Sequence, residues 1–472
     1  MKKLDILKSF KNKKFKYGSL STLMIAIFLS ILIIINLLVG KLNLNKDLTK
    51  NKMFSLSQQT YKILNNVKED IKIYAFYRSG QENYAMSTVL DQYKNNSKKI
   101  SVEYVDPNKK TQIGKKFIED NTKITDGTLV VEGKSKFKVI DSNELFNYNY
   151  SNPYNPTPES IAVEQNITSA ISYVTSDKST IVYTLQGHDE SEIPSQVSKQ
   201  LALENYSMQP INLSIKGNEL KENSILLISS PKRDLSSLEV TSLKNYLSKG
   251  GKAIFLMDLI KDDLPNFQSI LNTYGITTQK AMVVEGNTQY VSQNPLYLLP
   301  KQEDNDILNS LNNNKLRVLI PGCQNIKISK SKDKSLDIES LLVTTNNSWA
   351  KTNLEATTIE KEKGDLNGPF NIAVSVTNNS NKSKLIVVSN STFISSQINS
   401  LSNSANLDFF MNSINWLQNK KQGISIRPKI LEDYVLQISV FDRLLFSGIV
   451  VIIIPLIILI MGLRTWLKRR KK

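Results

Sequence analysis

The sequence predicts an α/β protein whose main body lies between two apolar terminal helices. Three observations predict this class. A long charge-free run stands near each end of the 472 residues, a basic tail lies beyond each run, and short apolar stretches alternate with amphipathic ones in between. Alternating strand-length and helix-length patterns are typical of sheets whose strands are joined by helices.

The C-terminal run, residues 444–463, reads LLFSGIVVIIIPLIILIMGL and carries no charge over twenty residues. As a helix it would be about 30 Å long, which matches the hydrocarbon thickness of a bilayer. Pro455 removes one backbone hydrogen bond near the middle, and transmembrane helices tolerate this loss. We predict a transmembrane helix here. The tail 464–472 then holds six positive charges, which the positive-inside rule places in the cytoplasm.

The N-terminal run mirrors this arrangement. Residues 1–18 hold seven lysines against Asp5, and residues 19–40 are uncharged. The alternative is a cleaved signal peptide, whose apolar region is usually about 7 to 15 residues long and precedes a small-residue cleavage site. This run is longer and GKLNLN after it offers no such site, so we predict an uncleaved transmembrane helix. Both tails are then cytoplasmic, and the chain is a two-pass protein of the cell membrane with a large extracytoplasmic region.

Composition excludes several classes of function. Each tail carries a net charge of +6 of the total +17, which leaves only +5 for the region between them. The excess therefore suits anionic lipid head groups of the bilayer, and we expect no nucleic acid partner. Cys323 and His188 are the single cysteine and the single histidine, so an intramolecular disulfide and most metal sites are excluded. No phosphate-binding P-loop motif occurs, and we predict neither a cofactor nor a metal.

The first part of the extracytoplasmic region, residues 41–150, follows a recognisable order of elements. A helix near 55–67 follows the first run. The later elements are a strand at 71–77, a helix at 82–95, a strand at 100–105, a short helix at 113–119 and a hairpin at 128–140. This order predicts a thioredoxin-like subdomain. Because it has no Cys-x-x-Cys pair, a redox role is excluded.

The second part, residues 151–430, reads as a parallel-sheet domain. Its predicted helices are 159–174, 193–204, 235–247 and 405–417, and its predicted strands are 181–185, 208–213, 225–228, 253–257, 370–376 and 384–388. A long amphipathic helix, a Gly-Gly pair and an apolar strand form a βαβ unit around Gly250, which implies parallel strands. Residues 279–363 show a weaker pattern, with polar runs such as LNNNKLR that we read as loops of a strand-rich insertion.

Two predicted strands end in polar residues. Gly187, His188, Asp189 and Glu190 follow the strand at 181–185, and Asp258 ends the strand at 253–257. Ligands of parallel sheets bind at the carboxyl ends of strands, so these five residues are candidates for a ligand or interaction site. The competing interpretation is a strand-to-helix turn, in which Gly187 supplies backbone freedom and an acidic residue favours the helix start. Both interpretations remain open.

No set of residues predicts catalysis. Cys323 lies in IPGCQN, after the only histidine, so the chain order is wrong for an amidotransferase-type nucleophile and we read it as an inert thiol. Paired carboxylates such as those at 262–263 lie in polar stretches that a solvated surface explains. We therefore predict a protein that is not an enzyme and has no catalytic residue.

Several stretches together carry a family resemblance. They are DLTKNKMFSLSQQT, VEQNITSAISYV, VYTLQGHDE, LKNYLSKGGKAIFLMD, LIVVSNSTFIS, LDFFMNSINWL and ISIRPK. In this order and spacing the chain resembles the GldG-like auxiliary components of ABC transporters, a family named for bacterial gliding motility. Where that family usually has Gly-His-Gly-Glu, this chain has Asp189. The resemblance implies an amidotransferase-like fold without its chemistry over residues 151–430, and partnership with a separate ABC ATPase and a multi-span permease.

The functional expectation combines these points. We expect a non-catalytic auxiliary subunit, anchored in the membrane, of an ABC-type transport complex of the gliding-motility kind. Its outer domain would bind substrate or envelope partners. The alternative is an enzyme that acts on envelope polymers through His188 and a nearby carboxylate. A sensor is a weaker third hypothesis, because tails of eighteen and nine residues hold no signalling domain.

Overall fold

The structure is a computed structural model of the chain. It describes residues 13–41, 47, 49, 52–118, 123–149, 157–176, 179–329, 334–420, 425–431 and 440–470. The basic tails predicted at 1–18 and 464–472 lie partly outside these ranges, and the predicted boundary at 150–151 lies wholly outside them. The chain divides into two compact units, one of residues 1–55 with 432–472 and one of Leu56–Leu431.

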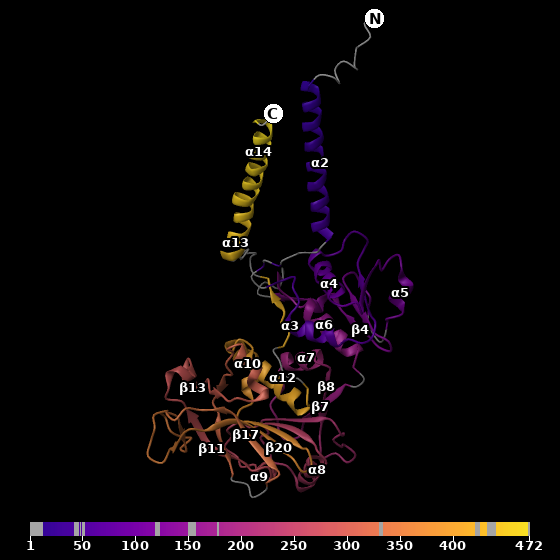
Figure 1. The fold of residues 1–472 in the computed structure, drawn as a ribbon. Helices are drawn as coiled ribbons and strands as arrows, with labels where there is room; N and C mark the ends of the chain where they lie inside the picture. Colours follow the sequence, from indigo (N-terminus) through magenta and orange to yellow (C-terminus); the bar gives the residue numbers. More distant parts are fainter. Residues whose placement is uncertain are drawn as a thin grey trace. The chain divides into compact units, whose positions relative to one another are not determined.

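The first unit contains the apolar helices. Helix α2 (Lys13–Lys41) includes the apolar window Gly18–Ile35, and the second window, Val440–Leu467, runs through three consecutive helical segments (Figure 1). These segments are α13 (Val440–Ser447), the π-helical η4 (Gly448–Ile453) and α14 (Ile454–Arg470). Neither window is buried in the protein, unlike the core helix of a soluble domain. Two terminal helices are therefore long and apolar enough to cross a membrane, as predicted.

The π-helical turn has an identifiable cause. Pro455, the second residue of α14, has no backbone N–H to donate and its ring crowds the carbonyl four residues earlier. Widening of the helix just before a proline relieves that crowding, and η4 ends two residues before Pro455. The predicted loss of one backbone hydrogen bond thus becomes a local change of helical type, and the helix continues on both sides.

The second unit begins with a small four-stranded sheet in the order β2-β1-β3-β4. Strand β1 is parallel to β2 and antiparallel to β3, and β3 and β4 form a hairpin. The elements are α3 (Gln58–Asn66), β1 (Ile71–Phe76), α4 (Tyr84–Asn96), β2 (Ile100–Val105), α5 (Thr111–Lys115), β3 (Leu129–Glu132), β4 (Phe137–Ile140) and η1 (Ser142–Glu144). The predicted order of strand, helix, strand, helix and hairpin is present.

A three-stranded sheet brings distant segments together. Strands β5 (Phe146–Asn149) and β6 (Thr157–Ile161) pair with each other, and β22 (Lys429–Ile430) pairs with β6 from the other end of the region. Helix α6 (Val163–Val174) follows β6 and packs on β3 and β4. We predicted a helix over 159–174, but its first residues belong to β6 because they pair with β5 and β22.

The largest sheet has twelve strands. Its main path is β19-β18-β11-β16-β20-β21-β10-β9-β7-β8, and β17 joins β20 and β14 beside this path. The strands are β7 (Thr180–Leu185), β8 (Tyr206–Ile211), β9 (Ile225–Ser229), β10 (Lys252–Leu256), β11 (Ile276–Val284), β14 (Lys301–Gln302), β16 (Gln324–Ile328), β17 (Leu336–Val343), β18 (Trp349–Lys351), β19 (Leu366–Asn367), β20 (Asn371–Asn378) and β21 (Lys384–Val388). Strands β12 (Val291–Ser292), β13 (Asn294–Leu298) and β15 (Ile320–Pro321) form a separate small sheet.

Five of the twelve strands of this large sheet run parallel to one another. Strands β8, β7, β9, β10 and β21 run parallel, as predicted, whereas the strands from β20 to β19 pair antiparallel. Within residues 279–363, which we read as an insertion, β14, β16, β17 and β18 extend the same sheet, whereas β12, β13 and β15 form the separate small sheet. The polar run LNNNKLR, predicted as a loop, begins inside helix α10 (Asp306–Asn313), since its first leucine is buried in the core.

Helices cover both faces of the large sheet and define where the core lies. Along β9, Leu227 packs in the cluster shared with α7, α10 and α12, while Leu226 and Ile228 pack in the cluster shared with α8 and α9. Figure 1 shows α10 and α12 on one side of the sheet and α8 and α9 on the other. The helices of this region are α7 (Ser195–Leu203), α8 (Ser237–Ser248), α9 (Pro265–Thr273), α10, η2 (Thr288–Tyr290), η3 (Thr392–Ile394), α11 (Ser396–Leu401) and α12 (Ala405–Leu417). Burial on both faces explains why the parallel strands read as continuous apolar runs.

Candidate functional site

Polar residues gather where four neighbouring parallel strands end. Strands β7, β9, β10 and β21 are adjacent, so the segments that follow them meet at one edge of the sheet. Backbone hydrogen bonds join these segments, from Ser191 to Ser229 and from Ser230 to Leu256. The predicted site residues all lie here. Residues 187–190, which we call the 187–190 turn, follow β7, and Asp258 follows β10.

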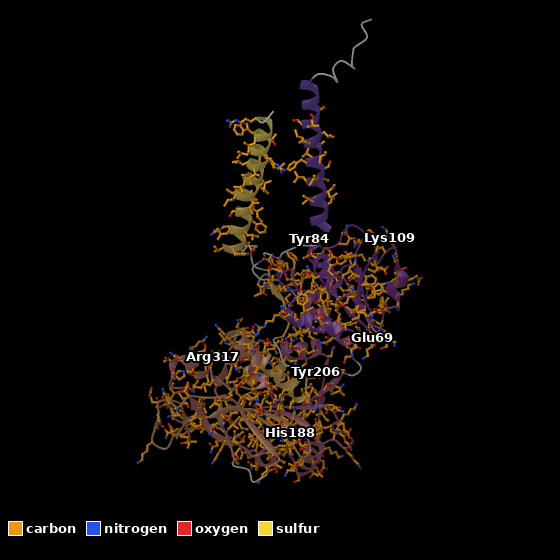
Figure 2. The ribbon with its side chains drawn as sticks, in the orientation of Figure 1. Glu69, Tyr84, Lys109, His188, Tyr206 and Arg317 are labelled. Atoms are coloured by element: carbon orange, nitrogen blue, oxygen red, sulfur yellow. The ribbon has the colours of Figure 1, made fainter. Side chains whose placement is uncertain are left out.

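His188 is the centre of the 187–190 turn and is buried (Figure 2). Its Nδ1 lies 3.1 Å from Oε1 of Glu190, and its Nε2 lies 3.3 Å from Oε2 of Glu239. The backbone N–H of His188 also donates to Glu190 Oε2 at 2.9 Å, and the ring meets Phe267 of α9 edge-on at 5.8 Å. We call His188, Glu190 and Glu239 the His188 cluster. It ties the turn to both helices on that face of the sheet.

Glu239 reaches the cluster because it belongs to a capping box. Ser236 is the N-cap of α8; its hydroxyl accepts from the Glu239 N–H, and the Glu239 carboxylate accepts from the Ser236 N–H at 2.9 Å. A carboxylate at a helix N-terminus is favoured by the helix dipole as well. Sequence analysis missed Glu239. The S-x-x-E pattern at 236–239 was the signal that could have identified its capping role, although not its contact with His188.

The charge of the cluster follows from its geometry. A neutral imidazole donates from one nitrogen only, whereas a protonated ring donates from both. The hydrogen bond to Glu190 and then the bond to Glu239 raise the pKa of His188, although burial opposes them. Burial by itself would raise the pKa of each glutamate, but hydrogen bonds from His188 to Glu190 and from Ser236 to Glu239 lower both pKa values. Both ring nitrogens are therefore occupied, which leaves neither as a general base or metal ligand.

Gly187 and Asp189 have different roles from their neighbours in the turn. Gly187 has φ +118°, and a Cβ there would lie 3.1 Å from the Asn212 side chain, so glycine is required. Asp189 is exposed and has φ +55°, a conformation that favours glycine. Its carboxylate forms two bonds with Arg233, from Nε at 2.8 Å and Nη2 at 3.0 Å. Arg233 also donates to the Gly187 carbonyl at 3.2 Å.

Asp258 belongs to a different cluster. Both of its carboxylate oxygens accept hydrogen bonds from Ser391, one from the backbone N–H and one from Oγ at 2.8 Å. Gln324 donates to the Asp258 carbonyl at 3.1 Å. Strand β9 separates β10 from β7, and within the described residues no hydrogen bond joins Asp258 to the 187–190 turn. The structure thus brings four of the five candidate residues together and leaves Asp258 apart, as a link between β10 and β21.

The remaining candidates for chemistry are the Cys323 thiol and groups of metal-ligating side chains. Cys323 is fully buried, and burial raises the pKa of its thiol to about 12, so the reactive thiolate does not form near neutral pH. Among the described residues, no group of three or more His, Cys, Asp or Glu side chains is arranged to hold a metal ion.

A second buried cluster escaped sequence analysis. Glu164 in the first turn of α6 is buried, and its side chain contacts Ser57, Thr60 and Lys429. Thr168 and Tyr93 complete what we call the Glu164 cluster, with Tyr93 OH 2.5 Å from Thr168 Oγ1. Burial by itself would raise the pKa of Glu164, but the charge and hydrogen bond of Lys429 lower it. No short motif signals this cluster, because its members come from four distant segments.

Comparisons with known proteins match two parts of the chain. Residues 179–413 match a family model described as "ABC-type uncharacterized transport system". Residues 50–148 match a model of a domain of unknown function. The first match spans all twelve strands of the large sheet, and the second spans the small four-stranded sheet. No curated protein matches the chain.

Solved structures are only distantly similar. The N-terminal domain of mmIFT52 is 16% identical, and the match covers 51% of this chain and 97% of that chain with a TM-score of 0.38. PurLQS from Thermotoga maritima is 10% identical, with 51% and 100% covered and a TM-score of 0.26. The exo-β-1,4-mannosidase Op5Man5 from Opitutaceae bacterium strain TAV5 is 6% identical, with 71% and 48% covered and a TM-score of 0.29. These scores are too low to assign a shared fold.

Proposed function

Because residues 179–413 belong to the family described as "ABC-type uncharacterized transport system", we propose that this chain is a non-catalytic, membrane-anchored auxiliary subunit of an ABC transport complex. The family match is the observation that carries the proposal. Two terminal helices of membrane-spanning length support it, since two spans are too few to form a transport pathway of their own. The chain therefore works with a separate ABC ATPase and a multi-span permease, as the GldG-like resemblance implies.

The proposal includes an arrangement of the chain. Both termini lie in the cytoplasm, and the region between the apolar helices lies on the other side of the membrane, where it binds substrate or envelope partners. Residues 41–150 form a thioredoxin-like subdomain without cysteines, and residues 151–430 form an amidotransferase-like subdomain without its chemistry. The basic tails support this orientation, because cytoplasmic flanks of membrane helices are enriched in lysine and arginine.

The geometry of the His188 cluster counts against the alternative, an enzyme that acts on envelope polymers. A general base must be able to take a proton from its substrate. His188 is buried and has a carboxylate at each ring nitrogen, so it has no free nitrogen for that task. The cluster is instead suited to holding the end of β7 against α8 and α9.

Purification of the full chain tests the partnership. The tagged chain is extracted from native membranes in a mild detergent, with an unrelated two-pass protein carrying the same tag as the control. We expect an ATPase with a P-loop and a multi-span permease to co-purify with this chain and not with the control. Recovery of neither protein would contradict the proposal.

Labelling of single cysteines tests the orientation. Cys323 is buried, so the natural chain gives a low background for thiol reagents. We expect Ser214→Cys, at an exposed position of the second unit, to react with a membrane-impermeant maleimide on intact cells. Lys471→Cys in the C-terminal tail should react only after the cells are opened. The reverse pattern would overturn the orientation while leaving the partnership untouched.

A further inference from the structure

Glu164 occupies an unusual position among the buried carboxylates. It lies in the first turn of α6, its side chain is only 5% exposed, and its two oxygens face two different chain segments. One of these segments follows the N-terminal apolar helix, and the other precedes the C-terminal one. The contacts on each side define what the carboxylate holds.

The first oxygen holds the segment that arrives from the N-terminal apolar helix. Oε1 accepts from the Ser57 N–H at 2.5 Å and from the Thr60 hydroxyl at 2.7 Å. Ser57 is the N-cap of α3, sixteen residues after the end of α2 at Lys41. The carboxylate therefore sits at the N-terminus of α3, where the helix dipole favours a negative charge.

The second oxygen holds the segment that leaves for the C-terminal apolar helix. Oε2 lies 2.9 Å from Lys429 Nζ, and the Lys429 side chain is only 16% exposed. Lys429 begins β22, which pairs with β6, and Leu431 donates to the Glu159 carbonyl at 2.7 Å. Helix α13 begins nine residues after Leu431, at Val440.

The carboxylate is fixed from behind by a buried hydroxyl network. Thr168, one turn further along α6, lies 3.0 Å from Thr60 Oγ1 and 2.5 Å from Tyr93 OH. Tyr93 of α4 also donates to the Glu164 carbonyl at 3.0 Å. All three side chains are fully or almost fully buried, so water does not replace these bonds. Glu164 cannot turn to follow one segment without losing the other.

We propose that Glu164 is a clasp that couples the two segments leading to the apolar helices, so that they open and close together. The physical reason is that a buried carboxylate is stabilised jointly by all its partners. When Lys429 withdraws, the charge left behind is unpaired and poorly solvated, and its bonds to Ser57 and Thr60 weaken with it. A displacement of either segment then changes the hold on the other through one group. This inference does not rest on the proposed function, since it concerns the chain alone.

Hydrogen exchange on the purified full chain in detergent micelles tests the clasp. Lys429→Met removes the charge of the lysine and keeps most of its aliphatic chain. We expect exchange to become about tenfold faster or more not only in peptides of residues 425–431 but also in peptides of residues 57–61, which Glu164 holds through its other oxygen. Peptides of β9 and β10 should exchange as in the natural chain.

Two control variants sharpen the result. Lys62→Met removes an exposed lysine of α3 that makes no bond to Glu164, and both regions should keep their natural exchange rates. Lys429→Arg retains the positive charge and should keep most of the protection of both. Faster exchange at residues 425–431 with unchanged residues 57–61 would overturn the coupling. An equal increase in β9 and β10 would overturn it too, because the effect would then be general unfolding.

Discussion

The His188 cluster and the Glu164 cluster both pair a buried carboxylate with a basic side chain, but they span very different lengths of chain. His188 and Glu239 are 51 residues apart, and their cluster fixes a turn against two helices of the same sheet. Ser57 and Glu164 are 107 residues apart, and Lys429 lies another 265 residues on. The difference teaches that one kind of interaction serves two purposes. The short-range His188 cluster holds a strand end in place, and the long-range Glu164 cluster joins the two ends of the second unit.

The largest effect is expected from Glu164→Ala, which breaks the long-range Glu164 cluster. Glu164→Ala leaves the Ser57 N–H, the Thr60 hydroxyl and the mostly buried Lys429 ammonium without their shared acceptor. We expect the free energy of opening of α3 and β22 to fall by about 3 to 5 kcal/mol, as when one partner of a buried ion pair is removed. Hydrogen exchange of these two elements measures the change. A loss below about 1 kcal/mol would show that the carboxylate is not a central link.

The next largest effect is expected from His188→Ala, which breaks the short-range His188 cluster. His188→Ala leaves two buried carboxylates without the imidazole that bonds to both of them. We expect the first turn of α8 and residues 187–190 to lose about 2 to 3 kcal/mol of opening free energy, while α3 and β22 stay unchanged. Hydrogen exchange resolves both regions in one experiment. Unchanged stability together with a loss of function would instead favour the enzyme hypothesis.

A change of pH should affect the stability contributed by the two clusters in different ways. The pKa of His188 is raised above its usual 6.5, so its contribution is full below pH 6.5 and is lost as the pH rises through the folded-state pKa. The pKa of Glu164 is lowered below 4.5, so its contribution is present above pH 4.5 and is lost only in acid. We expect the stability difference between the natural chain and His188→Gln to shrink from pH 6 to pH 9.

The same pH change supplies its own control. The stability difference between the natural chain and Glu164→Ala should stay nearly constant from pH 6 to pH 9, since Glu164 remains ionised throughout. Thermal unfolding at both pH values measures the two differences. A His188→Gln difference that grows with pH would mean that the ring is neutral in the folded protein.

The smallest effect is expected at Asp189, the exposed residue of the 187–190 turn. Asp189→Gly removes a solvent-exposed pair with Arg233, worth about 0 to 1 kcal/mol, and relieves a backbone with φ +55° by a similar amount. We expect a net change within about 0.5 kcal/mol. Asp189→Ala loses the pair and keeps the unfavourable φ, so it should cost about 1 kcal/mol more than Asp189→Gly. Urea unfolding of the two variants measures the difference, and equal stabilities would show that the backbone is not strained there.

Much of the fold could be predicted because its signals are local. Strand β21 and helix α12 have the residue limits that the sequence predicts, since a buried apolar run and an amphipathic pattern each depend on neighbouring residues. The pairing of β11, β16 and β20 into the large sheet could not be predicted, because strand partners are chosen across many intervening residues. The sequence therefore predicted parallel strands, but it did not show that antiparallel strands continue the same sheet.

The candidate site shows the same division. The Gly-His-Asp-Glu sequence after an apolar strand identified a turn at a sheet edge, and the structure places all four residues there. The sequence also placed Asp258 at a strand end. The sequence could not show that Ser391 donates hydrogen bonds to both carboxylate oxygens of Asp258, since these two residues are 133 positions apart.

The two apolar terminal helices, the alternation of strands and helices between them, and the 187–190 turn follow from the sequence, because each depends on the order of adjacent side chains. Only the tertiary structure decided the partners of the buried charges, Glu239 for His188 and Lys429 for Glu164. The physical reason is that a charge removed from water is stabilised by whatever lies within a few ångströms of it, and the folded chain, not the spacing of residues, sets which groups those are.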